Sequence, residues 1–156
     1  MDILKAVQLA KELMEIHGVN QLGYSFRYNK RRNFAGICSY RNKTIELSLP
    51  LTRLSNEEDV IDTILHEIAH ALTEGHGHDH VWRRKAIEIG CNGKRCFGKE
   101  KESMYEAFNN IAKVVGTCPN GHQHFRNRMP KIGKRYSCNS CSNKFNVNFL
   151  ITYKLK

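Results

Sequence analysis

The sequence predicts an α+β fold with a larger N-terminal domain and a small C-terminal appendage. Two segments, 2–17 and 55–72, repeat apolar residues at helical spacing, and three short segments between them read as strands. Near the C-terminus, cysteine and histidine pairs indicate a separate metal-stabilised unit. At 156 residues and 40% hydrophobic content, the chain can hold one modest core and an appendage. We therefore predict domains over 1–112 and 113–156.

The N-terminal elements follow in order. A helix over 2–17 is ended by Gly18, and strands are expected over 24–28, 34–40 and 44–49, the last ended by Pro50. The basic cluster 30–33 and the segment 41–43 read as the turns between the strands. The simplest arrangement is a three-stranded antiparallel sheet.

A second amphipathic helix is expected to begin at Ser55, because Ser55 and Glu58 match the capping-box pattern. The acids of its first turn suit the positive end of the helix dipole, and Gly75 offers a left-handed stop. A further helix is expected over 79–89, with Trp82 facing inward, and a weaker one over 100–115. The buried stripe of the second helix consists of Val60, Ile61, Ile64, Leu65, Ile68 and Leu72.

This second helix carries the pentad His66-Glu67-Ile68-Ala69-His70. Residues four apart lie on one helical face, so both imidazoles can reach one metal ion, and Glu67 is placed to act as general base. Two histidines do not close a zinc site, and a third ligand must come from elsewhere. The candidates in the following loop are His76, His78 and His80.

The runs Thr44–Ser48 and Asp62–Leu72, followed by Gly77-His78 and Trp82-Arg83, resemble the SprT-like metalloproteases. The resemblance is strong over 22–92. It implies a zincin-like metalloprotease domain in which His66, His70 and His78 bind a catalytic zinc ion and Glu67 is catalytic. His78 is the match because it precedes the aromatic Trp82 by four residues. The family members that have been characterised cleave proteins crosslinked to DNA. For the oxyanion-stabilising group, His76, His80 and Tyr105 remain open.

A second zinc site is expected near the C-terminus, where two pairs of ligands on tight knuckles are typical of a zinc ribbon. A segment of about 40 residues buries too little apolar surface to fold without a metal. SprT-like proteins often end in a ribbon with two Cys-x-x-Cys pairs, but here the first pair lacks its second cysteine. We choose His122 in its place, with His124 as the alternative. The predicted structural zinc ligands are Cys118, His122, Cys138 and Cys141.

The remaining cysteines carry weaker signals. Cys91 and Cys96 lie on the loop after the third predicted helix, where we expect a structural role, since no partner pair is free for a third metal site. Cys38 is expected to be a buried thiol on a strand.

The C-terminal part is strongly basic. Residues 107–156 hold nine Lys and Arg and no Asp or Glu. Such a stretch matches a polyanion, and cations interleaved with Phe125 and Tyr136 suit single-stranded or non-specific DNA, although the aromatics also serve as core. The predicted nucleic-acid contacts are Arg126, Arg128, Lys131, Lys134 and Arg135.

The sequence has no apolar run of about 20 residues and no basic-then-apolar leader, so we expect a cytoplasmic, DNA-associated monomer without membrane contact. Its six cysteines are expected to be thiols or metal ligands. The function expected is that of a zinc metalloendopeptidase acting on DNA-associated or DNA-crosslinked proteins. The alternative is a non-catalytic, zinc-stabilised DNA-binding module, which a fourth protein ligand at the first site would favour.

Overall fold

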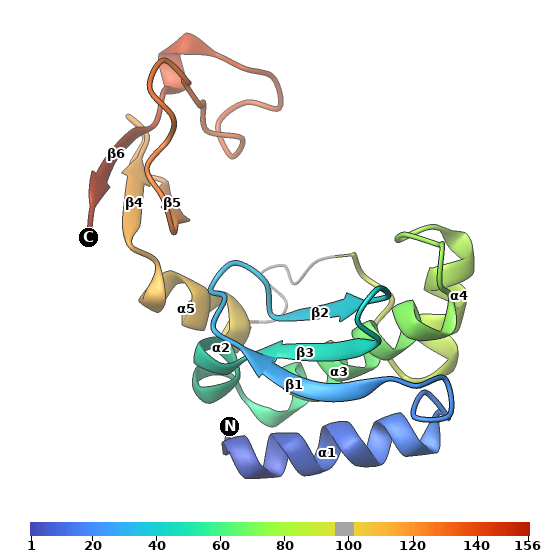
Figure 1. Cartoon of the computed structure of the whole chain (residues 1–156). Coiled ribbons are helices and arrows are strands. Elements are labelled where there is room, and N and C mark those ends of the chain that lie inside the picture. The colour runs from blue at the N-terminus through green and yellow to red at the C-terminus, as the bar shows by residue number, and fades with distance from the viewer. Residues whose placement is uncertain (96–101) are drawn as a thin grey trace. The chain divides into compact units, whose positions relative to one another are not determined.

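The computed structural model describes residues 1–95 and 102–156 and divides the chain into two compact units, Met1–Ala107 and Phe108–Lys156 (Figure 1). The division falls within helix α5 (Glu102–Ile111). This is a few residues before the boundary at 112 that the sequence analysis places between the domains. The chain is α+β.

The N-terminal unit contains one three-stranded sheet of β1 (Ser25–Asn29), β2 (Gly36–Ser39) and β3 (Thr44–Ser48), in the order β1-β3-β2. Strand β3 runs antiparallel to β2 but parallel to β1, so the prediction of an antiparallel sheet is wrong for one pair. The reason is the segment after β1, which is no tight hairpin turn and instead leads the chain to the far side of β3. Central β3 is buried along its whole length, as strands covered on both faces are.

Two helices cover this sheet and form the main core with it (Figure 1). Helix α1 (Ile3–Ile16) is capped by Asp2 and ends before Gly18, which has φ 69°. Helix α3 (Glu57–Leu72) carries the pentad and buries most of the predicted stripe. The core consists mainly of Ala6, Ala10 and Met14 from α1, Ile45 and Leu47 from β3, and Val60, Ile64 and Ile68 from α3.

The start of α3 differs from the predicted capping box. Asn56 is the N-cap, and its side chain accepts a hydrogen bond from the backbone N–H of Asp59 at 2.8 Å. Ser55 instead ends a short helix that was not expected, α2 (Leu49–Leu54), where its hydroxyl donates to the carbonyl of Leu51. Pro50 fits the first turn of α2, where its missing N–H costs nothing. Strand β3 ends at Ser48, and Ser48 is also the N-cap of α2.

A second, smaller core joins α3 to α4 (His80–Glu88). Asp79 caps α4 by accepting hydrogen bonds from the N–H groups of Val81 and Trp82. The core is made of Leu65, Ala69, Trp82, Ala86 and Cys91. Cys91 is therefore a packed side chain, as expected, whereas Cys96 lies outside the described residues. Cys38, on β2, is half-buried, and burial raises the pKa of its thiol to about 12.

The C-terminal unit is built on a second three-stranded sheet, β4 (Val114–Thr117), β5 (Gln123–Arg126) and β6 (Thr152–Leu155), with the short 3₁₀ helix η1 (Val147–Phe149) before β6. The order is β5-β4-β6 and both pairs are antiparallel. The first two residues of β4, Val114 and Val115, lie in the segment 100–115 that was predicted to be helical. The helix in this segment, α5, stops at Ile111 in the described part. At Gly116 a Cβ would stand 2.5 Å from the ring of Tyr153 on β6, so only glycine lets this ring pack there.

Among the described residues, no helix is both long and apolar enough to span a bilayer.

Candidate functional site

Three imidazoles meet in the N-terminal unit. His66 and His70 lie one turn apart on α3, and His78 approaches them from the loop between α3 and α4. The Nε2 atom of His78 lies 3.0 Å from Nε2 of His66 and 3.1 Å from Nε2 of His70. Two nitrogens bound to one tetrahedral zinc ion at the usual bond length lie about 3.3 Å apart. The donor atoms are thus arranged as ligands of a single ion.

The three imidazole rings pack against the indole of Trp82. Its indole, 1% exposed, has its centroid 4.7 Å from that of His66, 5.1 Å from that of His70 and 4.6 Å from that of His78. Asp79 caps α4 by accepting hydrogen bonds from the N–H groups of Val81 and Trp82. His78 directly precedes this N-cap residue and Trp82 lies in the first turn of the helix, so the start of α4 positions both side chains. The four-residue offset from His78 to Trp82 therefore has a physical meaning in this fold.

The protonation of the rings suits metal binding. Burial, together with the charge of His78, lowers the pKa of the His70 imidazole to about 4, and a hydrogen bond to the backbone of His76 opposes this only partly. Partial burial and the positive charge of Arg95 lower the pKa of His78. Both rings are neutral at neutral pH, which is the form that binds zinc.

Glu67 lies next to the histidines and is 7% exposed. Its carboxylate packs against the backbone of Gly36 on β2, where a Cβ atom would stand 2.7 Å from Cγ and from Oε1 of Glu67. Both residues line a cleft of about 620 Å³ that also contains the three histidines. The cleft is bounded by the segment 33–38, by α3 and by Lys94 and Arg95.

The other histidines of the loop lie outside this cluster. The Nδ1 atom of His76 is 2.8 Å from Oδ2 of Asp79, and His80 is exposed at the first position of α4. Among the three groups considered for oxyanion stabilisation, neither His76 nor His80 lines the cleft. The side chain of Tyr105, on α5, lies outside the described part of the structure.

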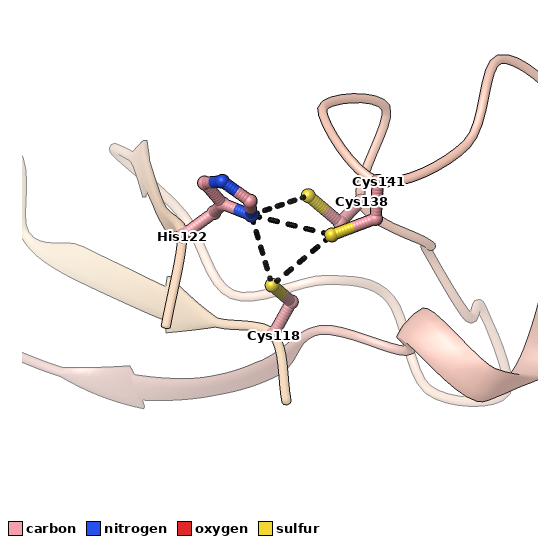
Figure 2. A group of neighbouring side chains, drawn as sticks. All are labelled: Cys118, His122, Cys138 and Cys141. Carbon is pink, nitrogen blue, oxygen red and sulfur yellow. Dashed lines mark hydrogen bonds between the residues drawn. The ribbon is translucent and has the colours of Figure 1, made fainter. Parts of the chain in front are cut away.

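A second cluster lies in the C-terminal unit, where Cys118, His122, Cys138 and Cys141 point toward one another (Figure 2). The Sγ atoms of Cys118 and Cys141 are 3.9 Å apart. From Nδ1 of His122 the sulfur atoms of Cys118, Cys138 and Cys141 lie at 3.6, 3.7 and 3.2 Å. Two sulfurs on one tetrahedral zinc ion are about 3.8 Å apart, so this donor set also fits a single ion.

Two tight turns bring these four ligands together. After Cys118 the chain turns at Gly121, whose φ is 80°, and the Gly121 N–H donates to the Cys118 carbonyl at 2.9 Å. After Cys138 the N–H groups of Cys141 and Ser142 donate to the Cys138 carbonyl. His124, the alternative ligand, lies on β5 opposite Gly116 and is not among the clustered donors. The structure thus brings His122, not His124, to the three cysteines.

The five predicted nucleic-acid contacts occupy two settings. Arg126 is half-buried on β5, with its guanidinium over the rings of Tyr136 and Tyr153 at 4.5 and 5.5 Å from their centroids. The other four are exposed on the segment after β5 and form no ion pair with any described residue: Arg128, Lys131, Lys134 and Arg135.

Two features of the site were missed from the sequence. Gly36 was not singled out, although a glycine inside a strand often marks a close backbone approach, here to Glu67. Asp62, one turn before His66, accepts hydrogen bonds from the backbone and side-chain amides of Asn92 at 2.7 and 3.0 Å. This contact connects the loop that carries Lys94 and Arg95 to α3, and no sequence pattern predicts it.

Comparison with known proteins gives three similarities. The human DNA-dependent metalloprotease SPRTN is 43% identical over 56 aligned residues, which cover 28% of this chain and only 12% of the human protein. The crystal structure of the metallopeptidase zymogen of Pyrococcus abyssi abylysin superposes with a TM-score of 0.48 at 20% identity, over 67% of this chain and 92% of its own, which is too distant to bear on function. The sequence model of the SprT-like family matches residues 6–106, well over half of the chain. The chain therefore belongs to the SprT-like family.

Proposed function

We propose that this chain is a zinc-dependent endopeptidase whose catalytic centre is formed by His66, Glu67, His70 and His78. The observation that carries the proposal is the convergence of three imidazoles, with donor atoms within 4.8 Å of one another, beside a buried glutamate in an open cleft. Membership of the SprT-like family, a family of metalloproteases, and the similarity to a human DNA-dependent metalloprotease support it.

The donor set fits a catalytic zinc ion better than a structural one. Catalytic zinc is held by three protein ligands with one position left for water or substrate, whereas structural zinc has four. In the part of the chain that the structure describes, the cluster of His66, His70 and His78 contributes three donors and no fourth. This favours an enzyme over a DNA-binding module with a purely structural first metal.

The chain's own residues then have distinct tasks. Zinc, when bound, supplies a Lewis acid that lowers the pKa of water to about 7 and polarises a carbonyl group. Glu67 accepts the proton of the attacking water on its carboxylate and passes it to the leaving amine nitrogen. Gly36 and Trp82 hold Glu67 and the imidazoles in place, and the His76 backbone fixes the orientation of the His70 ring.

The second cluster has the character of a structural zinc site, because four donors leave no open position. We propose that Cys118, His122, Cys138 and Cys141 bind a zinc ion that makes the C-terminal unit fold. Few large side chains are buried in this unit, so metal binding is expected to supply much of its stability.

The substrates that we propose are proteins bound or crosslinked to DNA. Residues 107–156 carry nine cations and no acid, and the four exposed cations after β5 are free to meet phosphates. The name of the human relative states that its activity depends on DNA. We expect binding to single-stranded or non-specific DNA by a monomeric, cytoplasmic protein, with the C-terminal unit bringing the peptidase to its substrates.

The peptidase proposal is tested by Glu67→Gln. The amide cannot accept the proton, so we expect cleavage of an unfolded protein such as casein to fall by about 10²–10⁴-fold while zinc content and melting temperature stay unchanged. The matched control is Glu74→Gln, which changes an exposed glutamate just after α3 that pairs with Lys43. Zinc-loaded wild-type protein without peptidase activity, with or without DNA, would leave the non-catalytic DNA-binding module as the function.

The DNA proposal is tested by salt. Affinity of the intact protein for DNA should fall steeply as salt rises, and the double change Lys134→Gln with Arg135→Gln should flatten that slope by about 2, since each lost phosphate contact removes about one released counterion. Salt-insensitive binding would contradict it.

A further inference from the structure

The segment between β5 and the next strand pairing forms a projecting loop, residues 127–135. The next pairing after β5 is the isolated bridge between Ser137 and Leu150. At the base of the loop, the guanidinium of Arg126 lies 4.5 Å from the ring centroid of Tyr136, and the Tyr136 carbonyl accepts a hydrogen bond from the N–H of Ile151 at 2.9 Å. Both ends of the 127–135 loop are therefore anchored to the sheet of the C-terminal unit.

A tight turn forms the tip of the 127–135 loop. The N–H of Lys134 donates to the carbonyl of Lys131 at 3.0 Å, which closes a four-residue turn. Gly133 has φ 78° at the third position, the backbone conformation that a type II turn requires. Ile132 occupies the second position, at the outer corner, and its side chain is fully exposed, at 106% of the reference area.

Nothing in the fold requires an isoleucine at this corner. The second position of a type II turn accepts most residues and favours proline, and the Ile132 side chain contributes no burial to the unit. A second apolar side chain, Met129, is 48% exposed on the same loop. The corner of the turn thus carries an apolar side chain that packing within the unit does not require.

Cations surround this apolar tip. Lys131 and Lys134 flank Ile132 within the turn, and Arg128 and Arg135 lie on the two arms of the loop. All four are exposed, and residues 107–156 contain no acid that could pair with them. An apolar side chain presented between Lys and Arg is the arrangement by which architectural proteins insert a wedge between base pairs while cations hold the flanking phosphates.

We propose that Ile132 is a wedge that enters a base step of duplex DNA, with Arg128, Lys131, Lys134 and Arg135 gripping the phosphates on either side. The inference rests on the proposed association with DNA and adds a mode of binding to it: the loop unstacks one step rather than only following the backbone.

The competing partner for a cationic loop with an apolar tip is an anionic membrane surface. Stable membrane attachment needs a large apolar area, since even one fourteen-carbon acyl chain gives only marginal binding. Unstacking a base step needs one inserted side chain. The single fully exposed isoleucine therefore fits the nucleic acid.

The test uses the full-length, zinc-loaded protein and a duplex oligonucleotide that contains 2-aminopurine, a base whose fluorescence rises when it is unstacked. Wild-type protein should raise the fluorescence on binding. Ile132→Ser should bind with affinity within about threefold of wild type, because the phosphate contacts remain, but should leave the fluorescence at the level of free duplex. Ile132→Leu should restore the rise.

Val147→Ser is the matched control, since Val147 is 58% exposed in the same unit but lies on η1, outside the 127–135 loop. It should behave as wild type in both measurements. Zinc content and circular dichroism of every variant check that the unit is folded.

The outcomes separate the two proposals. Failure of wild-type protein to bind DNA even at low salt would overturn both the DNA association and the wedge. Binding without a fluorescence rise, or an equal rise with Ile132→Ser, would overturn the wedge alone. Binding to vesicles of anionic lipid that is lost in Ile132→Ser, without any unstacking of DNA, would assign the loop to a membrane surface instead.

Discussion

The backbone of Gly36 touches the carboxylate of Glu67: a Cβ atom at position 36 would stand 2.7 Å from Cγ and Oε1 of Glu67 and 3.0 Å from Cγ2 of Thr63. Strand β2 and helix α3 therefore approach as closely as they do because position 36 has no side chain. The strand that borders the cleft also sets the position of the proposed general base.

Gly36→Ala should consequently reduce peptidase activity by displacing Glu67. A displacement of about 1 Å at a catalytic group can cost about 10²-fold in rate, and we expect a loss of this order. Overpacking should also lower stability by about 1–3 kcal/mol. Zinc content should not change, because the three heavy atoms nearest to the new methyl group belong to Glu67 and Thr63 and none to a zinc-binding histidine. The measurements are casein cleavage, zinc content and thermal melting.

Gly77→Ala is the control for this prediction. Gly77 also lies beside the histidine cluster, but it has no positive φ, and a Cβ atom added there would have no atom within 4 Å. Its activity should stay within about twofold of wild type. Full activity of Gly36→Ala would show that Glu67 tolerates the displacement or is not the base.

The ligand role of His78 makes a separate prediction. His78→Ala should lose both peptidase activity and the zinc of the N-terminal unit, because its Nε2 lies within 3.1 Å of those of the other two histidines. His76→Ala and His80→Ala should keep that zinc, since both side chains lie outside the cluster. Zinc analysis after dialysis distinguishes the three variants. Loss of zinc in His76→Ala but not in His78→Ala would refute the assignment.

Zinc stoichiometry is the third prediction. Wild-type protein should contain two zinc ions. Cys138→Ser should lose one and unfold the C-terminal unit, because folding there is coupled to metal binding. His70→Ala should lose the other and leave the C-terminal unit folded, which backbone amide NMR signals of β4 and β5 would show. One zinc ion in the wild type would contradict the two sites.

The elements that could be predicted from the sequence are those with strong local signals. The helix around His66, the ending of helices at glycines with positive φ, and the offset of His78 from Trp82 all depend on residues close together in the chain. The same holds for the knuckle of Cys138 and Cys141, whose ligands lie three residues apart.

What the sequence did not predict depends on contacts between distant segments. The parallel pairing of β1 with β3 follows from the burial of β3 at the centre of the sheet. The sequence of one strand taken alone does not predict its place in the strand order. The start of α3 at Asn56 instead of Ser55 follows from α2, which uses Ser55 for its own end. The approach of Gly36 to Glu67 joins residues of a strand and a helix that local patterns treat separately.

The last prediction concerns acid stability and Glu46, which is 7% exposed on β3. Burial alone would raise the pKa of its carboxyl, but hydrogen bonds from Arg27, Asn29 and Thr44 and the charge of Arg27 outweigh it and lower the pKa. A carboxyl whose pKa is lower in the folded state stabilises the fold above its unfolded pKa of about 4.3, and this stabilisation disappears as pH falls through the folded value. Glu46→Gln should therefore lower the free energy of unfolding by about 1–2 kcal/mol at pH 6–7, seen as a lower melting temperature than wild type. The difference should shrink below about pH 4.5. Protonation of the histidine ligands affects both proteins equally and cancels in the comparison.

Glu12→Gln, at an exposed position on α1, should show no such pH-dependent difference. A gap between Glu46→Gln and wild type that persists undiminished at pH 3.5 would mean that the side chain's packing, not its charge, supports β3.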